Sequence, residues 1–226
     1  MVPDVQKEII GRTPVYLVED HHHALVPWRE VCRELGTPPH VLTLDHHTDT
    51  LPAFTHYNEV HGTRHLLRIS VEEALDDLRH DEHFDFAVRN NLIRSATIFS
   101  HVNFAIDVNP ALQIIHDPPP DESPETLAAY YAKILESDFL RHNLEQAPLP
   151  CAVPYILDID LDCFKGERSV MPEDPAVFRE LIRNAAAITI CRERDWVRLL
   201  NLDFGRQQYE FFLSKLLELI RNTLEN

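Results

Sequence analysis

The stretch VPYILDIDLD (residues 153–162) decides the fold, together with HVLTLDHHTD (residues 40–49). In each stretch, a short apolar run typical of a buried β-strand passes directly into acidic or imidazole side chains. A third run, PVYLVEDHHH (residues 14–23), has the same form. Charged groups at the end of a buried strand are costly unless something pairs with them. The three stretches therefore predict a sheet that gathers ligand side chains at its edge.

Helical and strand-like segments alternate along the chain. We expect strands at 14–18, 40–44, 104–106, 112–115, 153–157 and 187–190, and helices at 26–35, 70–80, 84–97, 123–139, 174–184 and over the last twenty residues. Residues 1–13 are interpreted as a polar lead-in and residues 50–69 as a loop. This order is typical of an α/β fold with three layers, in which helices cover both faces of a mostly parallel sheet. We expect one domain over residues 1–226, with strands 14–18 and 40–44 paired in parallel.

The composition argues against several classes of protein. A formal net charge of −16 disfavours binding to nucleic acid and to anionic membranes, because phosphate recognition needs a basic surface. The chain contains five glycines and no glycine-rich phosphate loop, and its four cysteines form no CxxC pair. No run approaches the ~18 apolar residues that a membrane span needs. We expect a cytoplasmic protein that acts on a small molecule.

Residue spacing favours a metal site at the strand ends. In an extended chain, residues i, i+2 and i+4 lie on one side, so Asp45, His47 and Asp49 would face together. Asp158, Asp160 and Asp162 have the same spacing. Like charges held this close repel each other unless a cation neutralises them. The mixture of carboxylates and imidazoles favours Mn²⁺, with Fe²⁺ or Zn²⁺ as alternatives.

These motifs resemble those of a known superfamily. Asp20-His21, residues 45–49 and residues 158–162 are similar, in order, to the three metal-binding motifs of the arginase (ureohydrolase) fold. The closest resemblance is to the uncharacterised UPF0489 proteins of that superfamily. It implies that His21, Asp45, His47 and Asp49 are ligands, with Asp45 bridging two Mn²⁺ ions. The third motif leaves two registers open, in which the ligands are either Asp160 and Asp162 or Asp158 and Asp160.

The resemblance also implies a reaction. It predicts a metal-dependent hydrolase of a C–N bond, such as that of an amidine or amide, with metal-activated water as nucleophile. His61 would transfer protons, and Glu193 would hold the substrate. Two glycines of the first motif are replaced by Val18 and Glu19, which alters that turn.

Two other functions stay open at this stage. One is a mononuclear Zn²⁺ hydrolase similar to deacetylases, and the other is a non-catalytic metal-binding or interaction protein. The leucine stripe near the C-terminus suits either core packing or contacts within a homo-oligomer.

Overall fold

The computed structural model describes residues 3–64, 69–106, 108–200 and 208–225 and contains one seven-stranded sheet. The strands are β1 (Gln6–Ile10), β2 (Thr13–Val18), β3 (His40–Asp45), β4 (Ser95–Ser100), β5 (Leu112–Ile115), β6 (Tyr155–Asp160) and β7 (Ala187–Cys191). The helices are α1 (Leu25–Leu35), α2 (Thr55–His61), α3 (Val71–Leu75), α4 (His83–Arg89), α5 (Pro124–Tyr131), α6 (Ser137–Gln146), α7 (Glu167–Val170), α8 (Ala176–Asn184), α9 (Arg194–Leu200) and α10 (Gln208–Leu224). Three short 3₁₀ helices complete the described elements: η1 (His21–Ala24), η2 (His80–Glu82) and η3 (Leu161–Cys163).

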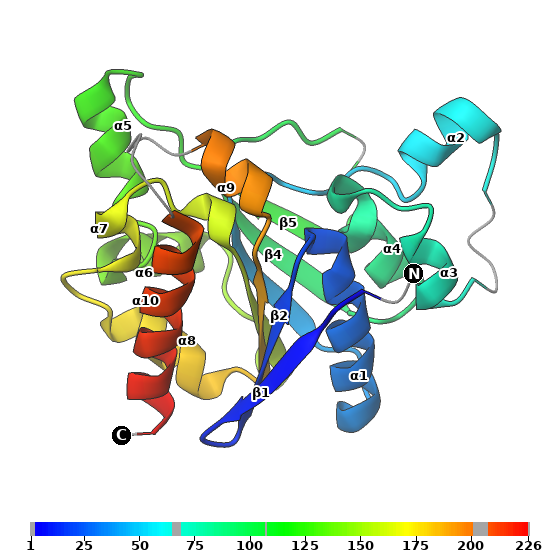
Figure 1. Cartoon of the computed structure of the whole chain (residues 1–226), viewed down its shortest axis with the longest axis horizontal. Helices are drawn as coiled ribbons and strands as arrows, with labels where there is room; N and C mark the ends of the chain where they lie inside the picture. The colour runs from blue at the N-terminus through cyan, green and yellow to red at the C-terminus, as the bar shows by residue number, and fades with distance from the viewer. Residues whose placement is uncertain (1–2, 65–68, 107, 201–207, 226) are drawn as a thin grey trace.

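The strand order is β1-β2-β7-β6-β3-β4-β5, and every pairing except β1 with β2 is parallel. Helices lie on both faces of this sheet (Figure 1). The predicted three-layer α/β class with a mostly parallel sheet is therefore confirmed. The direct pairing predicted for strands 14–18 and 40–44 is wrong, because β7 and β6 lie between β2 and β3.

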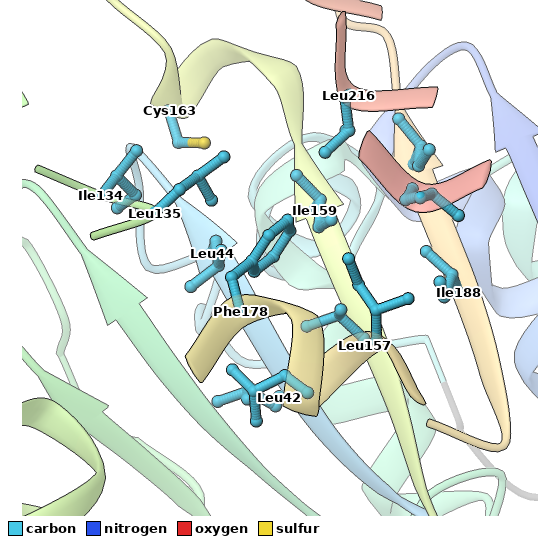
Figure 2. Close-up of a cluster of buried hydrophobic side chains, with 14 of the residues drawn as sticks. Leu42, Leu44, Ile134, Leu135, Leu157, Ile159, Cys163, Phe178, Ile188 and Leu216 are labelled. Carbon is cyan, nitrogen blue, oxygen red and sulfur yellow. The ribbon is translucent and has the colours of Figure 1, made fainter. Parts of the chain in front are cut away.

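One face of the sheet is apolar. Alternate residues of the central strands point to it, among them Leu42, Leu44, Leu157 and Ile159. Helices α6, α8 and α10 cover this face, and the Phe178 ring of α8 packs over the strands (Figure 2). Helix α8 has a marked apolar side, which explains why residues 174–184 could be predicted as a helix from sequence.

The opposite face carries a polar row in the middle of the sheet. Thr43 of β3, Asp158 of β6 and Thr189 of β7 lie side by side in register. Both threonine hydroxyls donate to the Asp158 carboxylate, and Trp28 of α1 donates from Nε1 to Thr189 Oγ1 at 3.3 Å. Helices α1, α3 and α4 cover this face with a second apolar cluster. The row leads to the carboxyl ends of the strands, where parallel sheets bind ligands.

Several elements differ from the sequence-based prediction. Residues 6–10, interpreted as lead-in, form β1, and residues 55–61, interpreted as loop, form α2. The helix predicted for 84–97 ends at Arg89, and its last part belongs to β4. Residues 104–106 form no strand, and the helix predicted for 123–139 is divided into α5 and α6. Within the described residues, no helix is long and apolar enough to cross a lipid bilayer.

Candidate metal centre

His21 is the centre of the acidic cluster. It follows β2 as the first residue of η1 and is completely buried. Its Nδ1 lies 2.9 Å from Asp49 Oδ2 and 3.3 Å from the Oδ2 atoms of Asp45 and Asp160. Three carboxylates from two strand ends and the following loop therefore surround one imidazole nitrogen. The sequence-predicted residues of all three motifs meet at this point.

A second group of ligand atoms shares Asp45 with the first. The atoms offered by Asp45, His47 and Asp162 lie within 4.8 Å of one another, as do those of His21, Asp45 and Asp160. His47 Nδ1 is 3.0 Å from Asp162 Oδ2. Because Asp45 belongs to both groups, the geometry suits two adjacent cations with a shared carboxylate.

Three of the carboxylates, those of Asp45, Asp160 and Asp162, are held by the same kind of hydrogen bond. One oxygen of each accepts a backbone N–H: Asp45 Oδ1 from His47 at 2.8 Å, Asp160 Oδ1 from Asp162 at 3.0 Å and Asp162 Oδ1 from His46 at 3.1 Å. The other oxygen, Oδ2, points into the cluster. Asp45 Oδ2 and Asp162 Oδ2 are buried, and each faces an imidazole nitrogen, His21 Nδ1 at 3.3 Å and His47 Nδ1 at 3.0 Å. Buried carboxylate oxygens and imidazole nitrogens that face one another in this way fit a divalent cation, which would bind both kinds of atom.

The pKa shifts within the cluster also favour a bound cation. Burial, together with Asp45, raises the pKa of Asp49 to about 7. Burial and Asp162 raise the pKa of Asp160 well above its ordinary value. Burial alone would lower the pKa of His47, but Asp162 overcomes that effect and raises it to about 9. Without a cation, protons must therefore take up part of the negative charge.

Asp158 lies behind His21. Its Oδ2 is 2.8 Å from His21 Nε2, the nitrogen on the other side of the ring from the three carboxylates. With no cation, Asp158, Asp45 and Asp49 overcome the effect of burial and raise the pKa of His21 well above its ordinary value. When the ring is neutral, the Asp158 carboxylate accepts the Nε2 proton and leaves the Nδ1 lone pair facing the cluster, as a metal ligand requires. This arrangement favours the register in which Asp160 and Asp162 are the ligands and Asp158 positions His21.

Glu193 lies next to the cluster. It follows β7, is 6% exposed, and has a left-handed backbone with φ of 30°. Its Oε1 accepts the His21 backbone N–H at 3.1 Å. Burial, with Asp49 nearby, raises its pKa to about 8. The structure thus brings the sequence-predicted Glu193 to the predicted metal-ligand residue His21.

Glu19, which replaces a glycine of the family motif, points to arginines. Its carboxylate pairs with Arg192 and Arg194, each at 3.2 Å.

His61 has a different position. It is the last residue of α2, is exposed, and stacks on Tyr57 with ring centroids 4.7 Å apart. None of its described contacts is with the acidic cluster, and its proton-transfer role stays a prediction.

Two histidines near the cluster, His80 and His83, were not predicted as site residues from the sequence. His80 contacts Trp196, and buried His83 packs on His21 with ring centroids 4.4 Å apart. The only sequence signal is the dense polar run RHDEH (residues 79–83), which resembled an ordinary surface segment.

A hollow opens beside the cluster. Its volume is about 200 Å³, and its lining includes His47, Asp49, His80, Asp81, Phe104 and Trp196. A second hollow of about 460 Å³ reaches Glu193 and shares His80 and Trp196 with the first. A small polar molecule could therefore approach both His47 and Glu193 from outside.

Comparison with solved structures identifies the fold. The chain is similar to proclavaminate amidino hydrolase from Streptomyces clavuligerus, with a TM-score of 0.52 and 15% identity over 93% of this chain and 62% of that chain. It is also similar to a hypothetical agmatinase from Burkholderia thailandensis, with a TM-score of 0.51 and 14% identity over 92% of this chain and 57% of that one. The chain thus has the arginase-like ureohydrolase fold, and it spans about three fifths of the length of these two proteins.

Sequence comparison adds no family. No protein-family model and no curated protein matches the chain, so the resemblance to the UPF0489 proteins stays a prediction.

Proposed function

We propose that the protein is a hydrolase that depends on divalent metal and cleaves a C–N bond of a small molecule, with an amidine as the preferred substrate class. The observation that carries this proposal is the pair of ligand groups that share Asp45 at the strand ends. The name of one similar structure, an amidino hydrolase, agrees with this choice. Mn²⁺ is the metal that a ligand set rich in carboxylates favours.

The proposal assigns each ligand residue to a cation. His21, Asp45, Asp49 and Asp160 would hold one cation, and Asp45, His47 and Asp162 the other. Bound cations of this kind supply a Lewis acid and make water a stronger acid.

The remaining residues would act on the substrate. Glu193 and Asp81 present carboxyl groups to the two hollows. A bound metal cation or a positively charged amidinium group beside Glu193 would lower its raised pKa and favour the ionised form, which can then pair with the amidinium. Trp196 and Phe104 line the first hollow and give it apolar surface. His80 borders both hollows and is placed to exchange a proton with a leaving amine. An accessible hollow beside the ligands favours an enzyme over a closed structural metal site.

Metal stoichiometry tests the proposal. The purified protein, stripped of metal and titrated with Mn²⁺ in a calorimeter, should bind two equivalents. Asp45→Asn should abolish binding at both positions, because both ligand groups use Asp45. His47→Ala should remove one equivalent and leave the other, since the His47 imidazole pairs with Asp162 and offers its ligand atom to the second group.

Activity is then measured with Mn²⁺ against amidines, guanidines and amides of small size, with release of ammonia or urea as the signal. Asp85→Asn is a matched control, because Asp85 is a buried carboxylate that accepts hydrogen bonds from Ala53, Arg89 and Asn109, outside the ligand groups. A wild-type protein that binds no divalent metal would contradict the proposal, as would full metal binding by Asp45→Asn.

A further inference from the structure

His83 has an environment that no part of the resemblance explains. It begins α4 at 0% exposure, and its ring packs against the rings of His21, Trp28 and Phe84. A ligand atom of His83 lies within 4.8 Å of ligand atoms of both His21 and Asp49. This third group of potential ligands shares two residues with the first cation position. His83 therefore lies at the metal centre, although none of the three motifs includes it.

The hydrogen bonds of His83 define its tautomer. Its Nδ1 is 2.6 Å from the carbonyl oxygen of His80, and a carbonyl can only accept. Nδ1 therefore carries a proton, and the lone pair of a neutral ring lies on Nε2. Nε2 is buried and, within the described part of the chain, has no hydrogen-bond partner. Metal-binding histidines commonly donate their other ring N–H to a backbone carbonyl, and His83 has this arrangement.

Packing alone does not account for the residue. His83 is surrounded by Trp28 and Phe84, and a phenylalanine ring would fill such a place without burying an unpaired nitrogen. The lone pair on Nε2 is satisfied if a cation lies between His83, His21 and Asp49. The same cation would neutralise the Asp49 carboxylate.

We propose that His83 is a direct ligand, through Nε2, of the cation held by His21 and Asp49. This inference rests on the proposed metal centre and extends it. The cation would then have two imidazole ligands, whereas the position at His47 has one. Because imidazole suits Zn²⁺, Co²⁺ and Fe²⁺ better than it suits Mn²⁺, the two positions should differ in metal preference.

The test compares His83→Phe with the wild type in Co²⁺ and Mn²⁺ binding, followed by calorimetry and, for Co²⁺, by visible absorption. Phenylalanine keeps the ring and removes the nitrogen. We expect Co²⁺ affinity at one position to fall at least about tenfold, since loss of even an indirect partner of a ligand costs ~10–100-fold. The Co²⁺ absorption bands should change, and Mn²⁺ affinity should fall by a smaller factor.

His40→Phe is the matched control. His40 is also buried, and its Nε2 has no partner among the described residues, but it lies at the opposite end of β3 and bonds Ser95 through Nδ1. Its loss should leave metal affinity and the absorption bands as in the wild type. Circular dichroism verifies that each variant is folded.

The outcomes separate the two proposals. If the wild type binds two cations and His83→Phe equals it in Co²⁺ affinity and absorption, the role of His83 is refuted and the metal centre stands. If the wild type binds no cation, both proposals fail. Should His83→Phe not fold, ¹⁵N NMR of the wild-type imidazoles decides: Zn²⁺ should shift the His83 Nε2 resonance, and an unchanged resonance overturns the inference.

Discussion

The change Asp158→Asn tests how the sheet positions His21, a proposed metal ligand. In the wild type, Asp158 accepts hydrogen bonds from His21 Nε2 and from the hydroxyls of Thr43 and Thr189. Asparagine has the same shape, and the threonine hydroxyls can rotate to accept its N–H groups, so the fold should survive. Either orientation of the amide should weaken the metal site. An amide nitrogen facing Nε2 would move the imidazole proton to Nδ1 and block the lone pair that faces the cluster, whereas an amide oxygen facing Nε2 would lack the negative charge that makes the ring a stronger ligand.

The expected magnitude follows from this geometry. Loss of a carboxylate that orients a metal-bound histidine typically weakens metal affinity ~10–100-fold. That factor corresponds to about 1.4–2.7 kcal/mol of binding free energy. At a fixed, saturating Mn²⁺ concentration, the stabilisation by metal should fall by the same amount. For a domain of this size, each kcal/mol shifts Tm by roughly 2–4 °C, so the metal-induced rise in Tm should shrink by about 3–11 °C.

The assay is thermal unfolding with and without Mn²⁺, together with calorimetric titration. The control Asp85→Asn removes another buried carboxylate and should lower Tm equally with and without metal, because its partners lie outside the ligand groups. If Asp158→Asn keeps the wild-type metal affinity and the wild-type rise in Tm, Asp158 does not set the tautomer of His21.

Two further predictions concern Glu193 and His40. Glu193→Gln should raise KM for a cationic amidine by about 10–100-fold, because a hydrogen bond to a charged group contributes ~1.5–3 kcal/mol. Two equivalents of Mn²⁺ should still bind. Steady-state kinetics and metal analysis measure these effects, and an unchanged KM would contradict the role of Glu193. Burial lowers the pKa of His40 from 6.5 to about 4, so between these values the unfolded chain binds more protons and stability falls as pH decreases. Between pH 7 and pH 4, the free energy of unfolding of His40→Gln should therefore fall by about 1–3 kcal/mol less than that of the wild type. Urea unfolding measures this, and an identical pH profile in the variant would refute it.

The central part of the fold could be predicted from sequence because its signals are local. Each of β2, β3 and β6 is a short apolar run that ends in polar residues, and a strand needs no distant contact to show that pattern. The alternation of side chains also placed Asp158 and Asp160 on one face. Both lie inside β6, although the predicted strand ended at Leu157.

Some elements were not predicted because their sequence patterns are weak, or because one continuous pattern covers two elements. Strand β1 has the sequence QKEII and only Ile10 is buried, since it lies at the edge of the sheet. The run 84–97 combines α4 and β4, and the turn between them falls at Asn91, whose φ of 55° requires a left-handed backbone. Asparagine tolerates that conformation, so residues 90–91 were an available signal for the end of the helix.

Strand order could not be predicted because it depends on contacts between distant segments. The helix between β2 and β3 suggested that these strands pair. The last strand of the chain, β7, instead pairs with β2 and places Glu193 beside His21, 172 residues away in sequence. The place of His83 is likewise set by how α4 packs on the sheet. Local pattern and the family resemblance therefore indicated the proposed ligands of the motifs and Glu193, but not His83.

The position of the proposed metal centre depends on the register of β6 more than on the loops. In the present register Leu157 and Ile159 face α8 and α10, while Asp158 and Asp160 face His21. A shift of one residue would bury both aspartates in the apolar layer and place leucine and isoleucine beside His21. Burying two carboxylates without partners is costly, and the apolar face would lose its packing at the same time. The same alternation that builds the core therefore fixes Asp158 and Asp160 at His21, so the ligands are oriented by the sheet itself.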